Sequence, residues 1–599
     1  MHDPYRKDVI VTAVLGVEQS LTAQRWVARE TSDDIVAAIV RTGSVSETVA
    51  RLLAGRGVAP ENVDFYLTPT FRNHLPDPLI LKQAGTAAER IAAAVMNGEK
   101  TAIFGDYDVD GATSSSLMYR FLRAVGVRDV LVRIPERDEG YGPTPEAFAD
   151  FAAQGVGLII TVDCGTTAFD AMAAAGKTDV VVIDHHEPDA SLPAVTALVN
   201  PKRLDEPLDH PCRNMAAVGV VFMVLIAVNR VLREKKWYSA DRPEPDLRQW
   251  LDLVALGTVC DVVALRGLNR LFVKAGLNRM AQGGNAGIAA MGRVSKIKYP
   301  PTTYHLGFVF GPRLNACGRI GQSSLGARLL CEDDAAKAEE IALSLEKLND
   351  ARRELCEDVY KQAIGQIESK TQPQTIVFAS GEGWHPGIVG IIAGRLKERY
   401  NLPALVAAVE NGEARGSGRS VAGFDLGAAV LTAKEQGILT TGGGHTLAAG
   451  FSCKADKLDE FKAFLEKRFA AQASAETVNA DYVVDSVIDI GAATWDLVQT
   501  LTAMEPFGEG NPEPRLAMAD VAVASARTVG QGHVSCRFVG RNGRTSVRAI
   551  AYRAVDSAIG AALLNAKGRM FHVVGHLQAD TFRGEGNVQF IIEDLAVAA

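Results

Sequence analysis

The segment Thr101-Ala-Ile-Phe-Gly-Asp-Tyr-Asp-Val-Asp-Gly111 joins a short apolar run to three aspartates within five residues. The apolar run Thr101–Phe104 predicts a β-strand, and the helical periodicity that begins after the aspartates predicts a helix. Asp106, Asp108 and Asp110 therefore follow a strand end. Carboxylates this close together repel one another unless a cation neutralises them, so the segment predicts a metal site. The alternatives are an acidic turn or a calcium loop, although an EF-hand loop would need a flanking helix in place of the strand.

The same arrangement recurs twice further along the chain. Leu158–Val162 predicts a strand that ends at Asp163, and Asp179–Ile183 predicts a strand that ends at Asp184-His185-His186. Fully apolar strands that alternate with helices are typical of a parallel sheet covered on both faces. Such sheets bind ligands at the carboxyl ends of their strands. We therefore expect the acidic and histidine side chains at one rim of the sheet.

A fourth acidic position, Asp261, follows the apolar segment Leu251–Leu256. An isolated aspartate is usually structural, but four acidic positions in equivalent places indicate a shared site. Cys164 and Cys260 adjoin two of the acids, yet neighbours along a strand point to opposite faces. Carboxylate and imidazole ligands without thiolate suit Mn²⁺ or Mg²⁺ better than structural Zn²⁺. So many carboxylates predict a two-metal site of the kind that cleaves phosphodiesters.

The composition excludes several classes of protein. The chain of 599 residues is 47% apolar and 22% charged, unlike a disordered chain, a collagen or a coiled-coil rod. Its net charge of −8 argues against coating of nucleic acid by bulk charge and leaves room for a local basic groove. Eight scattered cysteines without a C-x-x-C pair fit a reducing compartment, so we expect a cytoplasmic protein. The longest apolar run, Met215–Val228, has 14 residues, which predicts a buried helix and no membrane span.

A polar stretch from 333 to 370 separates two α/β regions. Its apolar residues stand at helical spacing: Ile341, Leu345, Leu348, Leu355 and Val359. We interpret the stretch as one long helix that connects two lobes, and two shorter, locally packed helices are the alternative. The second lobe, 375–470, is expected to contain strand Thr375–Ala379, helix Ile388–Tyr400 and a Gly-rich turn, Gly442–His445.

The last 120 or so residues are rich in predicted strands. Val534–Val539 and Ser546–Ala551 flank Asn542-Gly543, a strong hairpin signal, and Phe571–Leu577 with Val588–Leu595 form a second pair. Several short strands with turn signals predict a small barrel or sandwich. Residues 521–599 carry nine Arg or Lys against five Asp or Glu, a net +4, whereas the rest of the chain is −12. A basic small barrel indicates an oligonucleotide binder, and an ordinary solvated β domain is the alternative.

The acid and histidine motifs around Asp106, Asp163, His185 and Asp261 resemble those of the DHH phosphoesterase family. Further motifs in the family's order, over roughly residues 70–599, point to its single-strand-specific exonuclease branch. They are Arg137–Gly142, Gly311–Arg319, Gly383–Gly390, Gly416–Ser420, Gly442–His445 and Glu505–Pro512. One departure is Cys317, where we expect alanine.

The resemblance implies an α/β fold of two lobes, a DHH parallel-sheet domain and a DHHA1-like domain, joined by a long helix. A C-terminal β-barrel of the OB type would follow and bind nucleic acid. We place the boundaries at 1–75 for an N-terminal segment without readable chemistry, 76–332 for the DHH catalytic domain, 333–370 for the connecting helix, 371–475 for the DHHA1-like domain and 476–599 for the OB-like domain.

Residue roles are carried over by motif. The implied metal ligands are Asp108, Asp110, Asp163, His185 and Asp261. The implied catalytic residues are Asp106 and His186, which bind the metals or support their ligands, and Arg313 and Asn315, which orient the scissile phosphate. The implied nucleic-acid-binding residues are Arg137, Tyr141, Arg319, His385, Ser417, Arg419 and His445. For Tyr141 a packed loop aromatic, and for His385 a residue that only shapes its turn, are open alternatives.

The resemblance implies an Mn²⁺- or Mg²⁺-dependent exonuclease that degrades single-stranded DNA from its 5′ end to mononucleotides, in DNA repair and recombination. A helicase and a single-strand-binding protein are the implied protein partners. A phosphodiesterase for short oligonucleotides or cyclic dinucleotides is the first alternative, and the long helix and C-terminal module argue against it. A binding protein with an inactive site is the second, and the complete acid set argues against that.

Overall fold

The computed structural model describes residues 12–43, 45–137, 139–140, 142–298, 300–369, 374–472, 481–580 and 583–598. The chain forms two compact units, which we treat separately. The lobe unit comprises 76–264 and 271–477, and the barrel unit comprises 1–75, 265–270 and 478–599. No helix in the described ranges is both long and apolar enough to cross a membrane.

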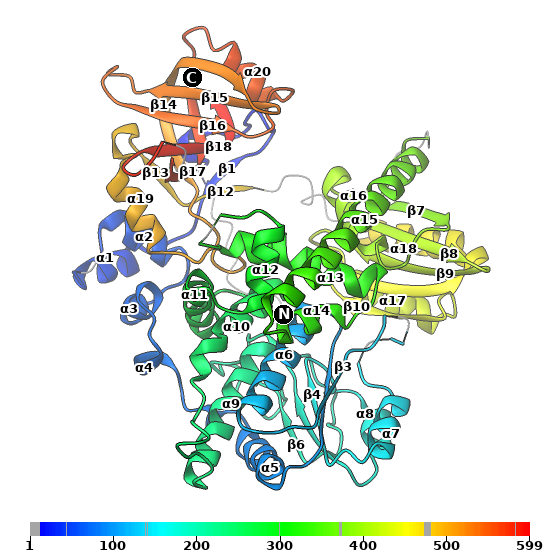
Figure 1. Ribbon diagram of the computed structural model, residues 1–599. Helices are drawn as coiled ribbons and strands as arrows, with labels where there is room; N and C mark the ends of the chain where they lie inside the picture. The colour runs from blue at the N-terminus through cyan, green and yellow to red at the C-terminus, as the bar shows by residue number, and fades with distance from the viewer. Residues whose placement is uncertain are drawn as a thin grey trace. The chain divides into compact units, whose positions relative to one another are not determined.

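A five-stranded parallel sheet organises the first lobe (Figure 1). Its order is β3 (Val130–Arg133), β2 (Thr101–Gly105), β4 (Leu158–Val162), β5 (Asp179–Ile183) and β6 (Ala197–Val199). Every residue of β2 and β4 is buried, which confirms the prediction of a sheet covered on both faces. One face packs on α7 (Pro145–Ala153) and α8 (Phe169–Ala174). The other packs on α5 (Ala84–Asn97), α6 (Val109–Ala124) and α9 (Ala217–Glu234).

The four acidic positions do not all follow strands. Asp106, Asp163 and Asp184 lie at the carboxyl ends of β2, β4 and β5, as predicted. The apolar segment before Asp261, however, belongs to helix α10 (Leu251–Cys260), and Asp261 is its C-cap residue. This helix packs against both α6 and α9, so its apolar run resembles that of a buried strand. The equivalence that we expected for Asp261 is therefore wrong, although its place at the site is not.

Five helices complete the first lobe and lead to the second. They are α10, α11 (Gly267–Ala281), α12 (Ala286–Val294), α13 (Gly311–Ile320) and α14 (Leu325–Cys331). The polar stretch that follows is one uninterrupted helix, α15 (Ala335–Glu368), of 34 residues. The alternative of two shorter helices is therefore wrong. Leu345, Cys356 and Val359 lie on its buried stripe.

The second lobe has a mixed sheet of order β10-β11-β9-β8-β7. Its strands are β7 (Val377–Glu382), β8 (Ala404–Glu410), β9 (Glu413–Arg419), β10 (Thr441–His445) and β11 (Ala448–Lys454), and its helices are α16 (Val389–Tyr400), α17 (Leu426–Glu435) and α18 (Leu458–Gln472). The Gly-rich segment predicted as a turn is thus the edge strand β10. It pairs closely with β11, because a Cβ atom at Gly444 would lie 2.3 Å from the carbonyl oxygen of Ala448.

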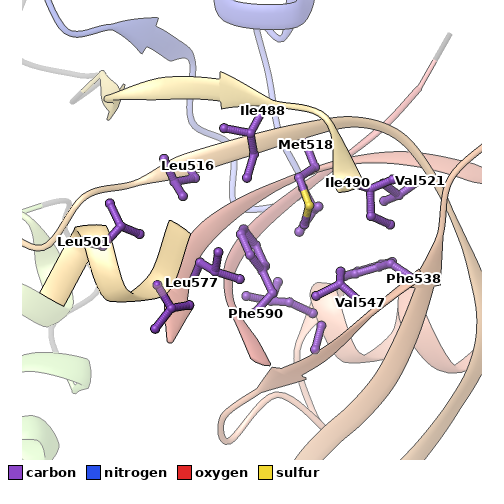
Figure 2. Close-up of a cluster of buried hydrophobic side chains, with 14 of the residues drawn as sticks. Ile488, Ile490, Leu501, Leu516, Met518, Val521, Phe538, Val547, Leu577 and Phe590 are labelled. Atoms are coloured by element: carbon purple, nitrogen blue, oxygen red, sulfur yellow. The ribbon is translucent and has the colours of Figure 1, made fainter. Parts of the chain in front are cut away.

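The C-terminal strands close into a barrel, as predicted. The strands β14 (Leu516–Val529), β15 (His533–Val539), β16 (Ser546–Ala551), β18 (Val588–Val597) and β17 (Met570–Ala579) pair in this order, and β17 returns to β14. The Asn542-Gly543 turn joins β15 to β16 in an antiparallel hairpin. Figure 2 shows Met518, Val547, Phe538 and Phe590 gathered in the buried core of this unit.

The N-terminal segment is part of the barrel unit. Strand β1 (Trp26–Ala28) pairs in parallel with β12 (Tyr482–Val484), and the fully buried Trp26 donates a 2.9 Å hydrogen bond from Nε1 to Asp594. Helices α1 (Asp33–Arg41), α2 (Glu47–Ala54) and α3 (Val63–Leu67) share their core with the barrel strands. Residues 12–75 therefore carry an architectural role that their sequence did not reveal.

Candidate metal centre

The aspartate loop after β2 is bent tightly onto α6. Asp108 is the N-cap residue of α6, and its carboxylate accepts a 3.0 Å hydrogen bond from the backbone N–H of Gly111. A Cβ atom at Gly111 would lie 2.3 Å from the carbonyl oxygen of Asp106, so only glycine permits this approach. The bend places Asp106, Asp108 and Asp110 around the rim of the sheet.

Asp110 is completely buried and held by the start of another helix. Its two carboxylate oxygens accept hydrogen bonds from the N–H groups of Ala217 (2.6 Å) and Val218 (2.9 Å) in the first turn of α9. This helix end favours the ionised carboxylate. On the other side a Cβ atom at Gly257 would lie 3.0 Å from Asp110 Oδ1, so α10 approaches closely there.

Asp163 adopts a backbone conformation that is unusual for a residue other than glycine. Its φ is +61°, at the carboxyl end of β4. Such conformations cost free energy and cluster at functional sites. The turn carries the carboxylate over the rim, where its Oδ1 lies 3.3 Å from His185 Nε2.

His185 is oriented as a ligand. Its Nδ1 lies 3.0 Å from the carbonyl oxygen of Met215, which accepts only from an N–H, so Nδ1 carries the proton and Nε2 presents its lone pair. Nε2 faces Asp163 and, at 3.9 Å, Asp110. Burial lowers the pKa of His185, which keeps the imidazole neutral and able to bind a metal.

Asp184 supports the two histidines through hydrogen bonds. It accepts hydrogen bonds from the backbone N–H groups of Thr166, His185 and His186 and from His186 Nδ1. Burial opposes ionisation, but these hydrogen bonds outweigh it and hold the pKa of Asp184 well below its usual range. Its charge in turn orients the His186 ring toward the site.

Three overlapping groups of ligand atoms emerge. They are Asp106–Asp108–Asp163, Asp110–His185–Asp261 and Asp163–His185–His186, and the ligand atoms of each group lie within 4.8 Å of one another. The structure thus brings together every residue predicted as a metal ligand, with Asp163 and His185 shared between groups.

The cluster is electrostatically unsatisfied without a cation. Burial and the neighbouring Asp108 raise the pKa of Asp106 and of Asp261 to about 7, and burial with Asp261 does the same for Asp110. Asp106 Oδ1 and Asp261 Oδ2 are buried and find no hydrogen-bond partner in the described part of the chain. Oxygen ligands with an imidazole fit Mn²⁺ or Mg²⁺, and the number of carboxylates fits two ions.

The raised pKa values predict that stability without metal falls as pH rises. Aspartates in an unfolded chain have a pKa near 3.9. Between about pH 4 and 7 the folded, metal-free protein therefore binds more protons than the unfolded chain, and its free energy of unfolding decreases with pH. In EDTA we expect Tm to fall from pH 5 to pH 8, whereas saturating Mn²⁺ removes this fall by neutralising the carboxylates. A metal-free Tm that rises over the same interval would contradict the account.

A cavity of about 190 Å³ lies beside the metal centre. Cys260, which precedes Asp261, lines it together with Asn315 and Arg319 of α13 and Arg352 of α15. Arg319 is held by a 2.9 Å hydrogen bond from its guanidinium to the carbonyl oxygen of Gly387. Burial, with Arg137 and Arg352 nearby, lowers the pKa of Arg319 to about 10. Clustered arginines of this kind are typical of a phosphate site.

Of the two residues predicted to orient the scissile phosphate, only Asn315 lines the cavity. Arg313 forms a bidentate ion pair with Glu346 of α15, with Nη2 at 2.9 Å from Oε1. Its Nη1 also donates to the carbonyl oxygen of Val309. The structure therefore places Arg313 as a link between α13 and the long helix.

The second lobe contributes a second polar cluster, formed by Ser417, Arg419 and the start of α16. Arg419 donates a 3.0 Å hydrogen bond to Ser417 Oγ, and burial lowers the pKa of Arg419. A Cβ atom at Gly390, in the first turn of α16, would lie 3.1 Å from Ser417 Oγ and 3.4 Å from Arg419. The N-terminus of a twelve-residue helix thus meets a hydroxyl and a guanidinium, a combination that suits an anion.

The remaining predicted nucleic-acid contacts are scattered. Arg137 lies over the Tyr107 ring, 4.5 Å from its centre, and donates to the carbonyl oxygen of Gly318. The exposed His385 accepts the N–H of Gly387 and so shapes its turn. His445 is exposed at the end of β10. Tyr141 lies outside the described residues.

Arg352 was missed in the sequence, although a signal was present. Leu345 and Cys356 lie on the buried stripe of α15, and residue 352 falls between them at helical spacing, seven positions after the first and four before the second. A charged side chain on an otherwise buried stripe is costly unless it is paired, so it indicates a partner or a ligand. Its Nε atom is buried without a hydrogen-bond partner among the described residues, and its Nη2 donates to Asn349.

Comparison with known protein families gives three matches along the chain. Residues 100–258 match the DHH family, N-terminal domain, residues 372–471 match the DHHA1 domain, and residues 484–594 match the RecJ OB domain. Their order is that of the first lobe, the second lobe and the barrel.

Individual relatives match over most of their length. The chain is 34% identical to the single-stranded-DNA-specific exonuclease RecJ of Dickeya dadantii over 92% of this chain and 96% of that protein. It is 31% identical to that of Bacillus subtilis over 96% of this chain and 71% of the relative. The crystal structure of RecJ in complex with Mn²⁺ from Thermus thermophilus superimposes with a TM-score of 0.77 at 27% identity, covering 94% of this chain and 78% of the other.

Proposed function

This chain belongs to the RecJ family of single-stranded-DNA-specific exonucleases, and we propose that it removes nucleotides from the 5′ end of a single strand. It is a metal-dependent exonuclease specific for single-stranded DNA. The observation that carries the mechanism is the rim of buried carboxylates and imidazoles, of which Asp106 Oδ1 and Asp261 Oδ2 are left without hydrogen bonds in the described residues.

The metal-binding roles follow from the three ligand groups. Asp106, Asp108 and Asp163 would hold one ion, and Asp110, His185 and Asp261 the other; Asp163 also lies in the third group, with His185 and His186. Bound Mn²⁺ or Mg²⁺ supplies an activated water and stabilises the leaving oxygen of the phosphodiester. Asp184 holds His186 at the rim through its 2.8 Å hydrogen bond.

The phosphates would be positioned by the cavity of the first lobe and by the polar cluster of the second. Asn315 and Arg319, which line the cavity beside Cys260, are suited to hold the scissile phosphate. Ser417, Arg419 and the start of α16 are suited to receive a terminal 5′ phosphate. This polar cluster supports 5′ polarity, because a guanidinium and a helix N-terminus attract a terminal phosphate and not a 3′ hydroxyl.

End-labelled DNA tests the function directly. The purified protein is incubated with Mn²⁺ and a single strand labelled at its 5′ or 3′ end, with duplex and EDTA controls. We expect labelled mononucleotide to appear at once from the 5′-labelled single strand and from neither control. Hydrolysis of dinucleotides without degradation of the long strand would instead favour a phosphodiesterase for small substrates.

The barrel is proposed to hold the incoming strand by charge. Arg537 and Arg548 lie directly opposite each other on β15 and β16, and the pKa of Arg548 is lowered by slight burial and by its neighbours Arg583 and Arg537. Directly opposed like charges destabilise a sheet. Their presence on one face of the hairpin therefore supports a role in phosphate binding.

Neutralising this face should weaken strand binding in a salt-dependent way. For the double substitution Arg537→Gln and Arg548→Gln, we expect the slope of log affinity against log salt to fall by about 1.4, since each lost phosphate contact contributes about 0.7. Anisotropy titrations of a long single strand at several salt concentrations measure this slope. Arg41→Gln with Arg72→Gln removes the same charge from exposed sites of the same unit and should leave the slope unchanged.

The cellular context rests on the family alone. The family suggests DNA repair and recombination in the cytoplasm, with a helicase to separate strands and a single-strand-binding protein to present them. Stimulation of duplex degradation by an added helicase tests the first partnership, and co-purification tests the second. A protein that degrades duplex unaided would remove the need for a helicase.

A further inference from the structure

We infer that Tyr304 and Phe308 form a stacking platform for a nucleobase of the single strand, next to the cavity proposed to hold its phosphate. The inference rests on the proposed function and adds to it a site for the base. We call this pair of side chains the aromatic platform.

The two rings are unusually exposed for aromatic side chains. Tyr304 is 63% exposed and Phe308 is 71% exposed, the most exposed aromatic residues among the large hydrophobic side chains of the described ranges. Their rings stack on each other, with centres 5.2 Å apart and planes inclined by 27°. Exposed apolar surface of this kind is unfavourable in water and usually marks a binding site.

The segment that carries the platform is a π-helix, η5 (His305–Phe310). π-Helical turns are rare and occur frequently at functional sites. Leu306 and Phe310 are fully buried and anchor the turn, so the two exposed rings lie on a rigid base. Tyr304 and Phe308 are four residues apart and therefore share one side of the turn.

The same turn borders the metal centre. Gly307 and Gly311, on the adjacent side, line the cavity together with Asn315, Arg319 and Cys260. The Sγ atom of Cys260 lies 3.4 Å from the carbonyl oxygen of Leu306 and can donate to it. Because Asp261 follows Cys260 directly, the turn that carries the platform contacts the residue next to a proposed metal ligand.

The chemistry of this neighbourhood favours a nucleobase as the occupant. Arg319 and Arg352 attract a phosphate into the cavity, which Gly307 and Gly311 of the same turn also line. A base attached to that backbone then meets the aromatic pair. Stacking on aromatic rings accepts every base, as a nuclease without sequence preference requires.

Binding of a short single strand, measured by fluorescence anisotropy in EDTA so that no hydrolysis occurs, tests the platform. We expect Phe308→Ala to weaken binding by about five-fold or more, the loss typical of one stacked base. Phe308→Tyr should bind like the wild type, whereas Phe308→Leu, which keeps apolar bulk without a ring, should weaken binding like Phe308→Ala. Because Phe308 is exposed, unchanged Tm values are expected for all three variants.

Removing a base from the DNA tests the same stacking contact without changing the protein. Strands with an abasic nucleotide at successive positions are bound to the wild type and to Phe308→Ala. At one position the missing base should weaken binding to the wild type and have no further effect on Phe308→Ala. Equal losses in both proteins at every position, or full binding by Phe308→Leu, would overturn the inference.

Three further outcomes separate this inference from its alternatives. Variants at Phe308 that bind DNA normally but shift the oligomeric state in light scattering would show the rings to be a protein interface, and the platform would be rejected. If the wild type fails to hydrolyse single-stranded DNA with Mn²⁺, the proposed function fails. If it hydrolyses normally and no Phe308 variant or abasic strand differs, only the platform fails.

Discussion

Asp163→Asn is expected to reduce hydrolysis of single-stranded DNA on the order of a thousandfold, which corresponds to about 4 kcal/mol of transition-state stabilisation. Asp163 would hold one ion together with Asp106 and Asp108, and its Oδ1 lies 3.3 Å from Nε2 of His185, which would hold the other, so the substitution acts on one proposed metal position and borders the second. Initial rates of mononucleotide release at saturating Mn²⁺ measure the loss.

The same variant should not be less stable than the wild type in EDTA. Burial and the charges of Asp110, Asp108 and Asp106 raise the pKa of Asp163 well above its usual range, so the ionised carboxylate destabilises the metal-free fold. An amide removes that charge at nearly constant shape. Loss of activity with an equal or higher metal-free Tm distinguishes a ligand from a structural residue.

Asp170→Asn is the matched control for this prediction. Asp170 lies in the first turn of α8, is exposed, and belongs to none of the three ligand groups. The same chemical change there should leave both the rate and the effect of Mn²⁺ on Tm intact. A folded Asp163→Asn protein that degrades DNA at the wild-type rate would refute the metal assignment.

Asp485→Ala is expected to destabilise the barrel unit by about 3–5 kcal/mol. The carboxylate of Asp485 accepts from Arg29 at 2.6 Å and from Arg56 at 3.2 Å, and the backbone N–H of Arg515 donates to its other oxygen. The side chains of Arg56 and Asp485 are 2% and 1% exposed, so the substitution leaves a buried guanidinium without its counter-charge. A Tm lower by about 6–20 °C follows for a unit of this size.

An exposed ion pair of the same unit provides the control. Asp33 pairs with Arg51 at 3.1 Å, but its side chain is 86% exposed. Asp33→Ala should therefore cost at most about 1 kcal/mol. In calorimetry only the transition of the barrel unit should move for Asp485→Ala. Equal shifts for the two substitutions would show that the buried pair does not hold residues 12–75 to the barrel.

Residues 12–75 carry no motif that indicates their place in the barrel unit. The helices α1 to α3 are short and amphipathic, and nothing in their pattern names the surface that they cover. That surface is made by strands more than 400 residues later, such as β14. Only folding brings the two segments together. Burial of apolar side chains is non-directional, so the sequence of one segment does not indicate which other segment covers it.

Local pattern predicted the chemistry of the site and most of its elements. Strand ends at Asp106, Asp163 and Asp184 are visible in the sequence, because each follows a fully apolar run and parallel strands share one carboxyl edge. The Asn542-Gly543 hairpin is equally local. The charge of Asp261 indicates its place in the cluster, but its sequence context does not indicate that a helix precedes it. A helix buried on several sides has the same apolar run as a buried strand.

Long-range packing decided the rest. Arg352 stands on a helix that is mostly solvated, and it becomes a cavity residue because α15 packs against α13. Arg313 carries the same charge in a recognisable motif, yet Glu346 takes it as a partner. The sequence could therefore predict the acidic positions at the strand ends, because one sheet edge assembles them. It could not predict which cations stay unpaired, because ion pairing depends on side chains that meet only in the folded protein.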